Sequence, residues 1–245
     1  MNTRRHRNNF VDEIVDTLTK SMQRQIYPPG SQLPSVEKLA EEIGAGRTTV
    51  REALRVLQTR GFVEIIHGAG TFVRYKPITL VTGQVLSFTE MVRERGMRAT
   101  SLILEQEVIK PDAELANKLS IEPDDLIYQL RRLRLADDLP VSVETSVMSQ
   151  KRFPNLFEQK WTPQTSLYNL LRDEYGIQTR YSEHTVRAVP AGRTESQLLQ
   201  IEFKSPVLLV ENLTFDEHGS AIEFGRSYYS STRFEYRVVV KPDPS

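Results

Sequence analysis

One short segment of the sequence carries side chains that could read DNA. On a helical wheel, a basic arc lies opposite a set of apolar positions. The arc consists of Arg47, Thr48, Arg51, Glu52 and Arg55. An α-helix fits the major groove, where arginine can donate two hydrogen bonds to guanine and threonine can contact a phosphate or a thymine methyl group. A solvated surface helix can have the same composition, so a second feature is needed to support this interpretation.

A glycine-rich loop after this segment provides that second feature. Gly68 and Gly70 would let the loop approach another backbone closely, and His67 beside them could enter a minor groove or donate to a phosphate. A loop histidine taken singly is more often just an exposed residue. The loop and the basic arc together indicate contact with DNA.

A different pair of side chains could bind an anion. The predicted strand 126–136 is apolar along one face as far as Leu130, and Arg132 and Arg134 then continue that face. Such a basic end needs either water or an anion beside it. Ordinary surface arginines would give the same pattern, because exposed arginine is the rule in folded proteins.

The next strand offers polar partners for these arginines. Ser142, Glu144 and Ser146 share one face of the predicted strand 141–148. A three-residue loop between the strands would place these side chains beside the arginine pair, whereas a two-residue loop would present Arg131 instead. Both registers are compatible with the sequence.

Other residues could complete an anion pocket. Ser87 and Ser166 each stand at the predicted start of a helix, where backbone N–H groups and the helix dipole favour a phosphate. Two carboxylates could accept hydrogen bonds from sugar hydroxyls or an amine, and two tyrosines could form flat walls with polar tips. These residues are Glu144, Glu223, Tyr168 and Tyr229.

Helical periodicity in the first part of the chain positions the DNA-reading candidates. Apolar residues recur at helical spacing over 9–26, where a Tyr-Pro-Pro-Gly run ends the first helix. Ser35 is typical of the N-cap of a second helix, which Gly44 ends. A third helix is expected from Thr48 to Arg60, followed by Gly61 as its terminator.

Two short strands follow the third helix. Residues 62–66 and 71–74 have strand-like patterns, and the loop 67–70 joins them as a β-hairpin. A helix, a helix-turn-helix and a hairpin wing in this order make a winged helix-turn-helix of about 70 residues. We therefore expect a DNA-binding domain at 1–74 and a linker at 75–83.

The remaining residues, 84–245, predict an α+β domain with a mostly antiparallel sheet. Short hairpin connections favour antiparallel pairing, because parallel strands need long crossovers. The expected strands are 102–109, 126–135, 141–148, 179–189, 207–215, 222–229 and 234–240. The expected helices are 84–95, 111–119, 166–175 and 194–200.

Composition excludes several classes of protein. The 245 residues carry 32 basic and 32 acidic side chains, but the basic excess lies at the N-terminal end, where residues 1–76 hold 12 basic and 8 acidic residues. The absence of Cys removes disulfides, thiol nucleophiles and Cys-ligated metals, and suits a reducing cytoplasm. No membrane-spanning or secretory segment is indicated.

Several runs at fixed spacing carry a family resemblance. They are PGSQLPS at 29–35, Leu39-Ala40, RTTVREAL at 47–54, Leu57, Gly61 and GAGTFV at 68–73. Together they resemble the GntR family of bacterial transcription regulators. The resemblance implies DNA contacts by Ser35, Arg47, Thr48, Thr49, Arg51, His67 and Gly68. Val36 and Gly46 depart from the family pattern, in which Arg and Ser are common at these positions.

The second part of the chain is similar to the HutC subfamily. The similarity lies in SFTEM at 87–91, LRLAD at 133–137, ETS at 144–146, SLY at 166–168 and EF at 223–224. It implies a UTRA effector domain, which resembles the chorismate lyase fold. It also implies a sugar phosphate as the effector, such as glucosamine 6-phosphate or N-acetylglucosamine 6-phosphate. The implied effector-binding residues are Ser87, Phe88, Arg132, Arg134, Glu144, Ser166, Tyr168, Glu223 and Tyr229.

The expected protein is thus a homodimeric repressor, released from operator DNA when an anionic effector moves the DNA-binding heads through the linker. An effector without phosphate is the alternative within this class. An enzyme is the alternative from another class, since Glu144, Glu223 and His184 could supply acid and base groups. Catalytic motifs for phosphate cradling, zinc or a nucleophilic serine are absent from the sequence. We expect no catalytic residue, no metal, no cofactor and no membrane partner.

Overall fold

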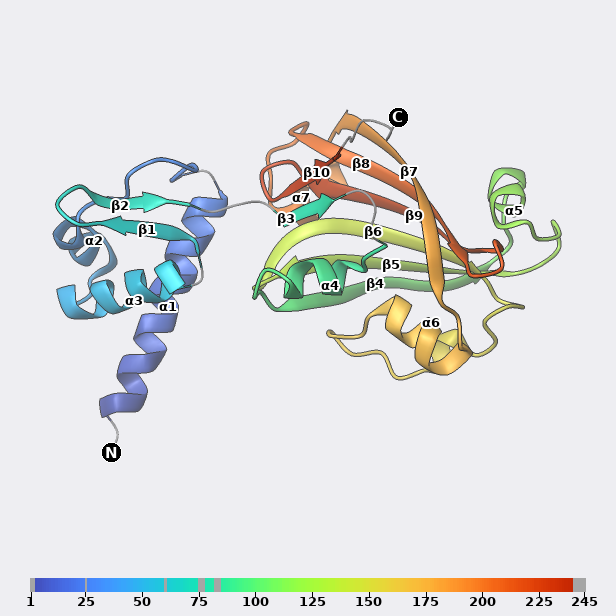
Figure 1. Cartoon of the computed structure of the whole chain (residues 1–245), viewed down its shortest axis with the longest axis horizontal. Helices are drawn as coiled ribbons and strands as arrows, with labels where there is room; N and C mark the ends of the chain where they lie inside the picture. Colours follow the sequence, from blue (N-terminus) through green and yellow to red (C-terminus); the bar gives the residue numbers. More distant parts are fainter. Residues whose placement is uncertain (1–2, 25, 60, 75–77, 82–84, 240–245) are drawn as a thin grey trace, which may run out of the picture. The chain divides into compact units, whose positions relative to one another are not determined.

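The chain divides into two compact units, Met1–Pro77 and Ile78–Ser245. A computed structural model describes residues 3–24, 26–59, 61–74, 78–81 and 85–239 (Figure 1). The winged helix-turn-helix followed by a mostly antiparallel sheet domain agrees with the fold predicted from the sequence.

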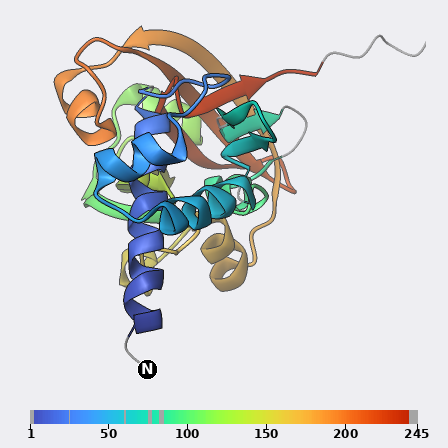
Figure 2. The same ribbon diagram turned by 90° about the vertical axis from the view of Figure 1, so that its left-hand side faces the viewer.

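The first unit contains three helices and a hairpin. They are α1 Thr3–Gln23, α2 Val36–Ile43, α3 Arg47–Thr59, β1 Val63–Ile66 and β2 Gly70–Val73. The first helix begins earlier than the predicted residue 9, because the polar residues before that point have no apolar periodicity for the sequence to reveal. Helix α3 packs against α1 (Figure 2), and this contact positions the exposed face of α3.

Local chemistry explains the ends of these helices. The Ser35 hydroxyl accepts a hydrogen bond from the Lys38 N–H, and Gly44 closes α2 in the left-handed conformation with φ of 70°. Gly61, after α3, has φ of 75°, a conformation that costs glycine little because it has no Cβ. The predicted cap and terminators of α2 and α3 are confirmed.

The second unit is built on a six-stranded antiparallel sheet with the order β4-β5-β6-β9-β8-β7. Its strands are β4 Ala99–Ile109, β5 Ile127–Ala136, β6 Leu139–Ser149, β7 Thr179–Pro190, β8 Pro206–Asp216 and β9 Ala221–Ser230. These correspond to six of the seven strands that the sequence predicted, with bounds that differ by at most three residues at either end. Figure 1 shows that this sheet is curved.

Helices cover both faces of this sheet. They are α4 Phe88–Arg93, α5 Ala113–Leu119, α6 Leu167–Tyr175 and α7 Arg193–Leu199, with a short 3₁₀ helix at Leu156–Glu158. Residues of α4 and α6 pack with Ala136, Tyr128 and Leu130 of β5. Residues of α5 and α7 pack on the opposite face, with Ile127 and Leu133.

A small parallel ribbon corrects part of the linker prediction. Residues Ile78–Val81 form β3, which pairs in parallel with β10, Phe234–Arg237. The linker prediction was therefore wrong at 78–81, whereas its residues 75–77 and 82–83 lie outside the described part of the chain. A run of four apolar or β-branched residues is too short to predict a strand, and the partner strand lies far away in sequence.

Candidate DNA-binding surface and ligand cavity

Helix α3 separates a buried face from an exposed one. Its apolar residues are buried against the unit core: Val50, Ala53, Leu54 and Leu57. Arg47, Thr48 and Arg51 are exposed, and Thr49 is half-buried. The tertiary packing therefore leaves Arg47, Thr48 and Arg51 of the predicted reading face exposed in this unit.

A carboxylate on α2 lies within the field of these arginines. The backbone N–H of Glu37 is the main cause of the lowered pKa of its carboxyl, and the charges of Arg47 and Arg51 lower this pKa further. The cap residue Ser35 is exposed, and its hydroxyl oxygen already accepts the 3.2 Å hydrogen bond from Lys38. The Ser35 side chain also hydrogen-bonds the Glu37 carboxylate and lowers the pKa of that group further.

The wing presents His67 and Gly68 at an exposed tip. Gly68 has φ of 77° and Gly70 has φ of 121°, so both need the freedom of glycine. Gln32 Nε2 donates to the carbonyl oxygen of Ala69 at 2.8 Å and ties the wing to the segment before α2. Sequence reasoning missed this role of Gln32, because a contact over 37 residues leaves no local pattern.

A cavity in the second unit collects the predicted effector-binding residues. The empty space at this site is about 720 Å³, a figure that includes open solvent at its mouth. All of the predicted residues line it: Ser87, Phe88, Arg132, Arg134, Glu144, Ser166, Tyr168, Glu223 and Tyr229. They come from two helix starts and from strands β5, β6 and β9.

The register between β5 and β6 places a carboxylate between the two arginines. Glu144 lies opposite Arg132, and Ser142 lies opposite Arg134. The turn has two residues, Asp137 and Asp138, but a bulge after it shifts the pairing by one position. A two-residue turn thus produces the arrangement that the sequence associated with a three-residue loop.

The arginine pair forms a buried cationic end of the cavity. Arg132 and Arg134 are each only 2% exposed. Arg132 Nη2 donates to Glu144 Oε1, and Arg134 Nη1 lies 3.6 Å from the same oxygen. Arg134 also donates to the Thr89 hydroxyl at 3.3 Å and lies over the Phe88 ring, 4.6 Å from its centroid.

The donors of this pair exceed their acceptors. Within the described residues, Arg132 Nε and Nη1 and Arg134 Nε are buried without a hydrogen-bond partner. Burial and the neighbouring charge of Arg132 lower the pKa of Arg134 to about 10. Buried cations without acceptors are costly, so an anion in the cavity would be stabilised by these donors.

The two carboxylates of the cavity differ in their environment. Burial raises the pKa of Glu144, but the charges of Arg132 and Arg134 outweigh burial and hold this pKa below its ordinary value. Burial, together with the negative charge of Glu144, raises the pKa of Glu223. Glu144 therefore neutralises part of the positive charge of the two arginines. Glu223 instead accepts hydrogen bonds from hydroxyl groups.

Glu223 holds the polar end of the cavity. It accepts hydrogen bonds from the Ser146 hydroxyl at 2.5 Å and from the Tyr168 hydroxyl at 2.6 Å. Tyr229 is nearly buried and lines the cavity, and burial raises the pKa of its phenol. These hydroxyl groups and carboxylates fit a ligand that is polar along its length.

The two serines at helix starts are N-caps, as predicted. Ser166 caps α6 by accepting from the Asn169 N–H, and Ser87 caps α4 in a capping box with Glu90. The Ser87 hydroxyl donates to the Glu90 carboxylate at 2.7 Å, so its proton is already engaged. Ser166 is the freer donor of the two.

Comparison with known protein families agrees with both units. The profile described as "Bacterial regulatory proteins, gntR family" matches residues 10–73, and the profile described as "UTRA domain" matches residues 94–235. The chain belongs to the GntR family. Its UTRA effector domain places this GntR regulator in the HutC subfamily.

Curated relatives of this GntR regulator match it along most of their length. The HTH-type transcriptional repressor NagR of Bacillus subtilis (strain 168) is 29% identical and covers 91% of both chains. The repressor MngR of Escherichia coli (strain K12) is 27% identical, covering 94% of this chain and 95% of the relative. The repressor PhnF of Mycolicibacterium smegmatis is 30% identical, covering 86% and 85%.

A solved structure supports the same assignment. The crystal structure of PhnF from Mycobacterium smegmatis has a TM-score of 0.67 with this chain at 28% identity, and covers 94% of this chain and 100% of the other. The curated relatives NagR, MngR and PhnF are all named as repressors. In the described part of the chain, no helix is long and apolar enough to cross a membrane.

Some cavity residues were missed by sequence reasoning on this GntR regulator. Ser182 and His184 of β7 and Asn212 of β8 also line the cavity. The sequence had suggested His184 only as an acid or base group of an enzyme, not as part of an effector site. Its alternation along a strand was visible in the sequence, but no signal showed that β7 would pair with β8 beside the cavity.

Proposed function

We propose that this GntR regulator is a repressor whose operator binding is relieved by a small phosphorylated sugar. The DNA-binding unit reads an operator through α3 and the wing, and the effector occupies the cavity of the second unit. The repressor acts as a homodimer in the cytoplasm, and each winged unit of the dimer reads one half of a palindrome.

The buried arginine pair carries the effector part of this proposal. Arg132 and Arg134 line a cavity that also holds Ser166, and three of their buried nitrogen atoms have no hydrogen-bond partner within the described residues. A phosphate group offers several acceptor oxygens to such donors and is compatible with their positive charge. Glu144, Glu223 and Tyr168 then provide hydrogen-bond partners for sugar hydroxyls or an amine.

The names of the relatives support both the repressor role and the chemical class. NagR, MngR and PhnF are named as repressors. MngR is named for mannosyl-D-glycerate, and a further relative from Escherichia coli O157:H7, 23% identical, is a probable repressor of a fructoselysine utilization operon. Sugar-derived compounds thus recur among these names.

The exposed residues of α3 and the wing support the DNA-binding part of the proposal. Arg47 and Arg51 would donate to base edges, Thr48 and Thr49 would contact phosphate or a thymine methyl group, and the wing residues would reach the adjacent groove. The Ser35 hydroxyl would donate to a phosphate at the start of α2. Phosphate contacts would make the affinity strongly dependent on salt.

The test is a combined stability and DNA-binding screen of the full chain. Candidate effectors are glucosamine 6-phosphate and N-acetylglucosamine 6-phosphate, with the unphosphorylated sugars and inorganic phosphate as controls. The operator is first selected from random duplexes by the purified protein. We expect a phosphosugar to raise the melting temperature and to release the operator, because a ligand of the native state stabilises it by mass action.

The outcomes separate the alternatives. Stabilisation and release by an unphosphorylated metabolite, with none by phosphosugars, would reassign the effector class and keep the regulator. Selection of no DNA sequence would overturn the operator-binding role itself.

A further inference from the structure

A chain of hydrogen bonds leads from the cavity to the β3–β10 ribbon. It starts at Glu223 Oε2, which accepts from the Tyr168 hydroxyl at 2.6 Å, and the Tyr168 oxygen lies 3.1 Å from the hydroxyl of Thr214. Thr214 Oγ1 lies 3.0 Å from the hydroxyl of Ser182, which is 3.1 Å from His184 Nε2.

The last contact reaches β10. His184 Nδ1 lies 3.3 Å from the Tyr236 hydroxyl. Tyr236 is half-buried, and its Cα partner on β3 is Leu80, which lines the cavity. The chain of contacts therefore connects the polar end of the cavity with the strand through which the polypeptide enters the second unit.

The number of protons available fixes which group donates and which accepts along this series of hydrogen bonds. An ionised Glu223 can only accept, so the single proton of Tyr168 goes to it and the proton of Thr214 goes to the Tyr168 oxygen. The Ser182–Thr214 contact is then a hydrogen bond when Ser182 donates to Thr214 at 3.0 Å, in place of its longer 3.4 Å hydrogen bond to the Leu213 carbonyl oxygen.

The histidine at the far end is fixed by the same argument. Because the Ser182 proton is used, His184 Nε2 must carry a proton and donate to Ser182, and Nδ1 must accept from Tyr236. The charge on Glu223 thus selects the tautomer of an imidazole on another strand. A ligand that takes the hydrogen bond of Glu223 or Tyr168 would remove that selection.

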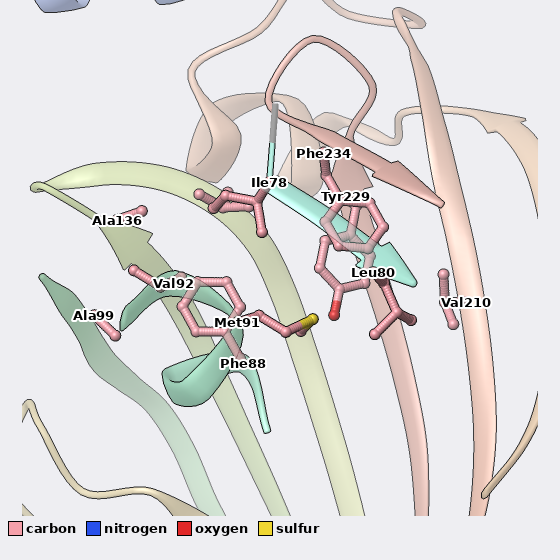
Figure 3. Packing of buried hydrophobic residues seen from close by; sticks show 11 residues of the cluster. Ile78, Leu80, Phe88, Met91, Val92, Ala99, Ala136, Val210, Tyr229 and Phe234 are labelled. Carbon is pink, nitrogen blue, oxygen red and sulfur yellow. The ribbon is translucent and has the colours of Figure 1, made fainter. Parts of the chain in front are cut away.

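A second, apolar path ends at the same ribbon. The ring of Tyr229, which lines the cavity, is stacked on Phe234 of β10 with centroids 3.8 Å apart. Figure 3 shows these two rings beside Leu80 and Ile78 of β3. Phe234 and Ile78 are each 1% exposed, so the ribbon has little room to move without moving the cavity wall.

We propose that His184 and Tyr236 are positioning residues of the effector response: they couple occupancy of the cavity to the β3–β10 ribbon through this directed hydrogen-bond chain. The proposal deepens the proposed function and rests on it for the identity of the effector. It concerns residues that do not need to contact the effector themselves.

The first test needs no effector. In the full chain labelled with ¹⁵N-histidine, we expect His184 to be in the Nε2–H tautomer, with Tyr168→Phe shifting its tautomer populations. The same variant should speed amide exchange at residues 78–81 and 234–237. The matched control is Tyr175→Phe, because the Tyr175 hydroxyl lies on the same helix but donates to the Pro154 carbonyl oxygen instead.

Two results would overturn the coupling. The first is a tautomer average at His184 like that of an exposed histidine such as His218, and the second is equal amide exchange at the ribbon in both tyrosine variants. Neither result depends on a phosphosugar, so the coupling can fail while the proposed effector class stands, or stand while that class fails.

The second test measures the response itself with glucosamine 6-phosphate as the probe. Tyr236→Phe should raise the sugar concentration for half-release of the operator by about fivefold or more, the low end of typical coupling between sites. Sugar binding measured without DNA should change less than about twofold. The control is Tyr181→Phe, because Tyr181 is an exposed tyrosine of β7 that takes no part in the hydrogen-bond chain. If Tyr236→Phe weakened sugar binding by the same factor as it raised the concentration for half-release, Tyr236 would have only a structural role and the coupling would be overturned.

Discussion

Buried guanidinium groups define the chemistry of the cavity at the scale of single residues. Arg132 and Arg134 share one carboxylate, and Arg132 Nε and Nη1 and Arg134 Nε have no hydrogen-bond partner within the described residues. Leaving such donors unmatched costs stability, which folded proteins tolerate where a ligand completes the site. We therefore expect removal of either arginine to weaken effector binding more than other changes in the cavity.

Replacing Arg134 tests this directly. We expect Arg134→Ala to weaken phosphosugar binding by about tenfold or more, because a charge-assisted hydrogen bond contributes roughly 1.5–3 kcal/mol. Isothermal titration calorimetry measures the change. Arg131→Ala is the matched control, because Arg131 lies on the same strand, directly before Arg132, but pairs with Glu105 on the opposite face at 2.9 Å. Equal losses in the two variants would contradict the assignment of the cavity.

The exposed arginines of α3 give the corresponding prediction for DNA. Arg47→Ala and Arg51→Ala should each weaken operator binding by roughly 1–3 kcal/mol, the usual contribution of a base contact. Fluorescence anisotropy at fixed salt measures this loss. Arg98→Ala, at an exposed arginine of the second unit paired with Asp138, should leave operator affinity unchanged. Wild-type affinity in both α3 variants would exclude them from the interface.

At the scale of elements, the β8–β9 hairpin depends on one carboxylate. Asp216 is 2% exposed and accepts hydrogen bonds from the backbone N–H groups of His218 and Ser220, and from Arg152. Burial raises the pKa of Asp216, but the N–H of Ser220 and the Arg152 guanidinium outweigh it, so this pKa is lower than in the unfolded chain. The ionised form of Asp216 therefore adds stability to the turn of this hairpin.

The sign of the pH effect follows from linkage. The depressed pKa adds stability above the unfolded pKa near 3.8, and that stability is lost as pH falls through the folded pKa. Asp216→Asn should lower the free energy of unfolding at pH 7 by about 1–3 kcal/mol, with a smaller difference below pH of about 4. Urea unfolding across pH measures this, with exposed Asp173→Asn as the control. A pH-independent difference would refute the linkage.

The elements also show how far local sequence signals reach. Glycine terminators, serine caps and strand alternation predicted nearly every helix and strand, because each signal acts within a few residues. The β3 strand was missed because its pairing with β10 is parallel and distant. The bulge after Arg134 could not be predicted either, since a two-residue turn is compatible with both registers.

At the scale of the whole molecule, repression requires two sites that influence each other. The family assignment provides the DNA-binding and effector units, and thermodynamics requires their coupling to be reciprocal. If the phosphosugar lowers operator affinity by a given factor, saturating operator must lower phosphosugar affinity by the same factor. Calorimetry of the sugar with and without operator measures this, and unequal factors would show that the protein has further bound or oligomeric states.

The sequence alone determined the family, the winged helix-turn-helix and the residue types of both sites, because caps, periodicity and spaced motifs are local. The tertiary structure decided which side chains meet. It placed Glu144 between two arginines through a bulge, and it brought Ser182, His184 and Asn212 to the cavity by strand pairing. Pairing between distant strands depends on the packing of the whole sheet, which no short stretch of sequence encodes.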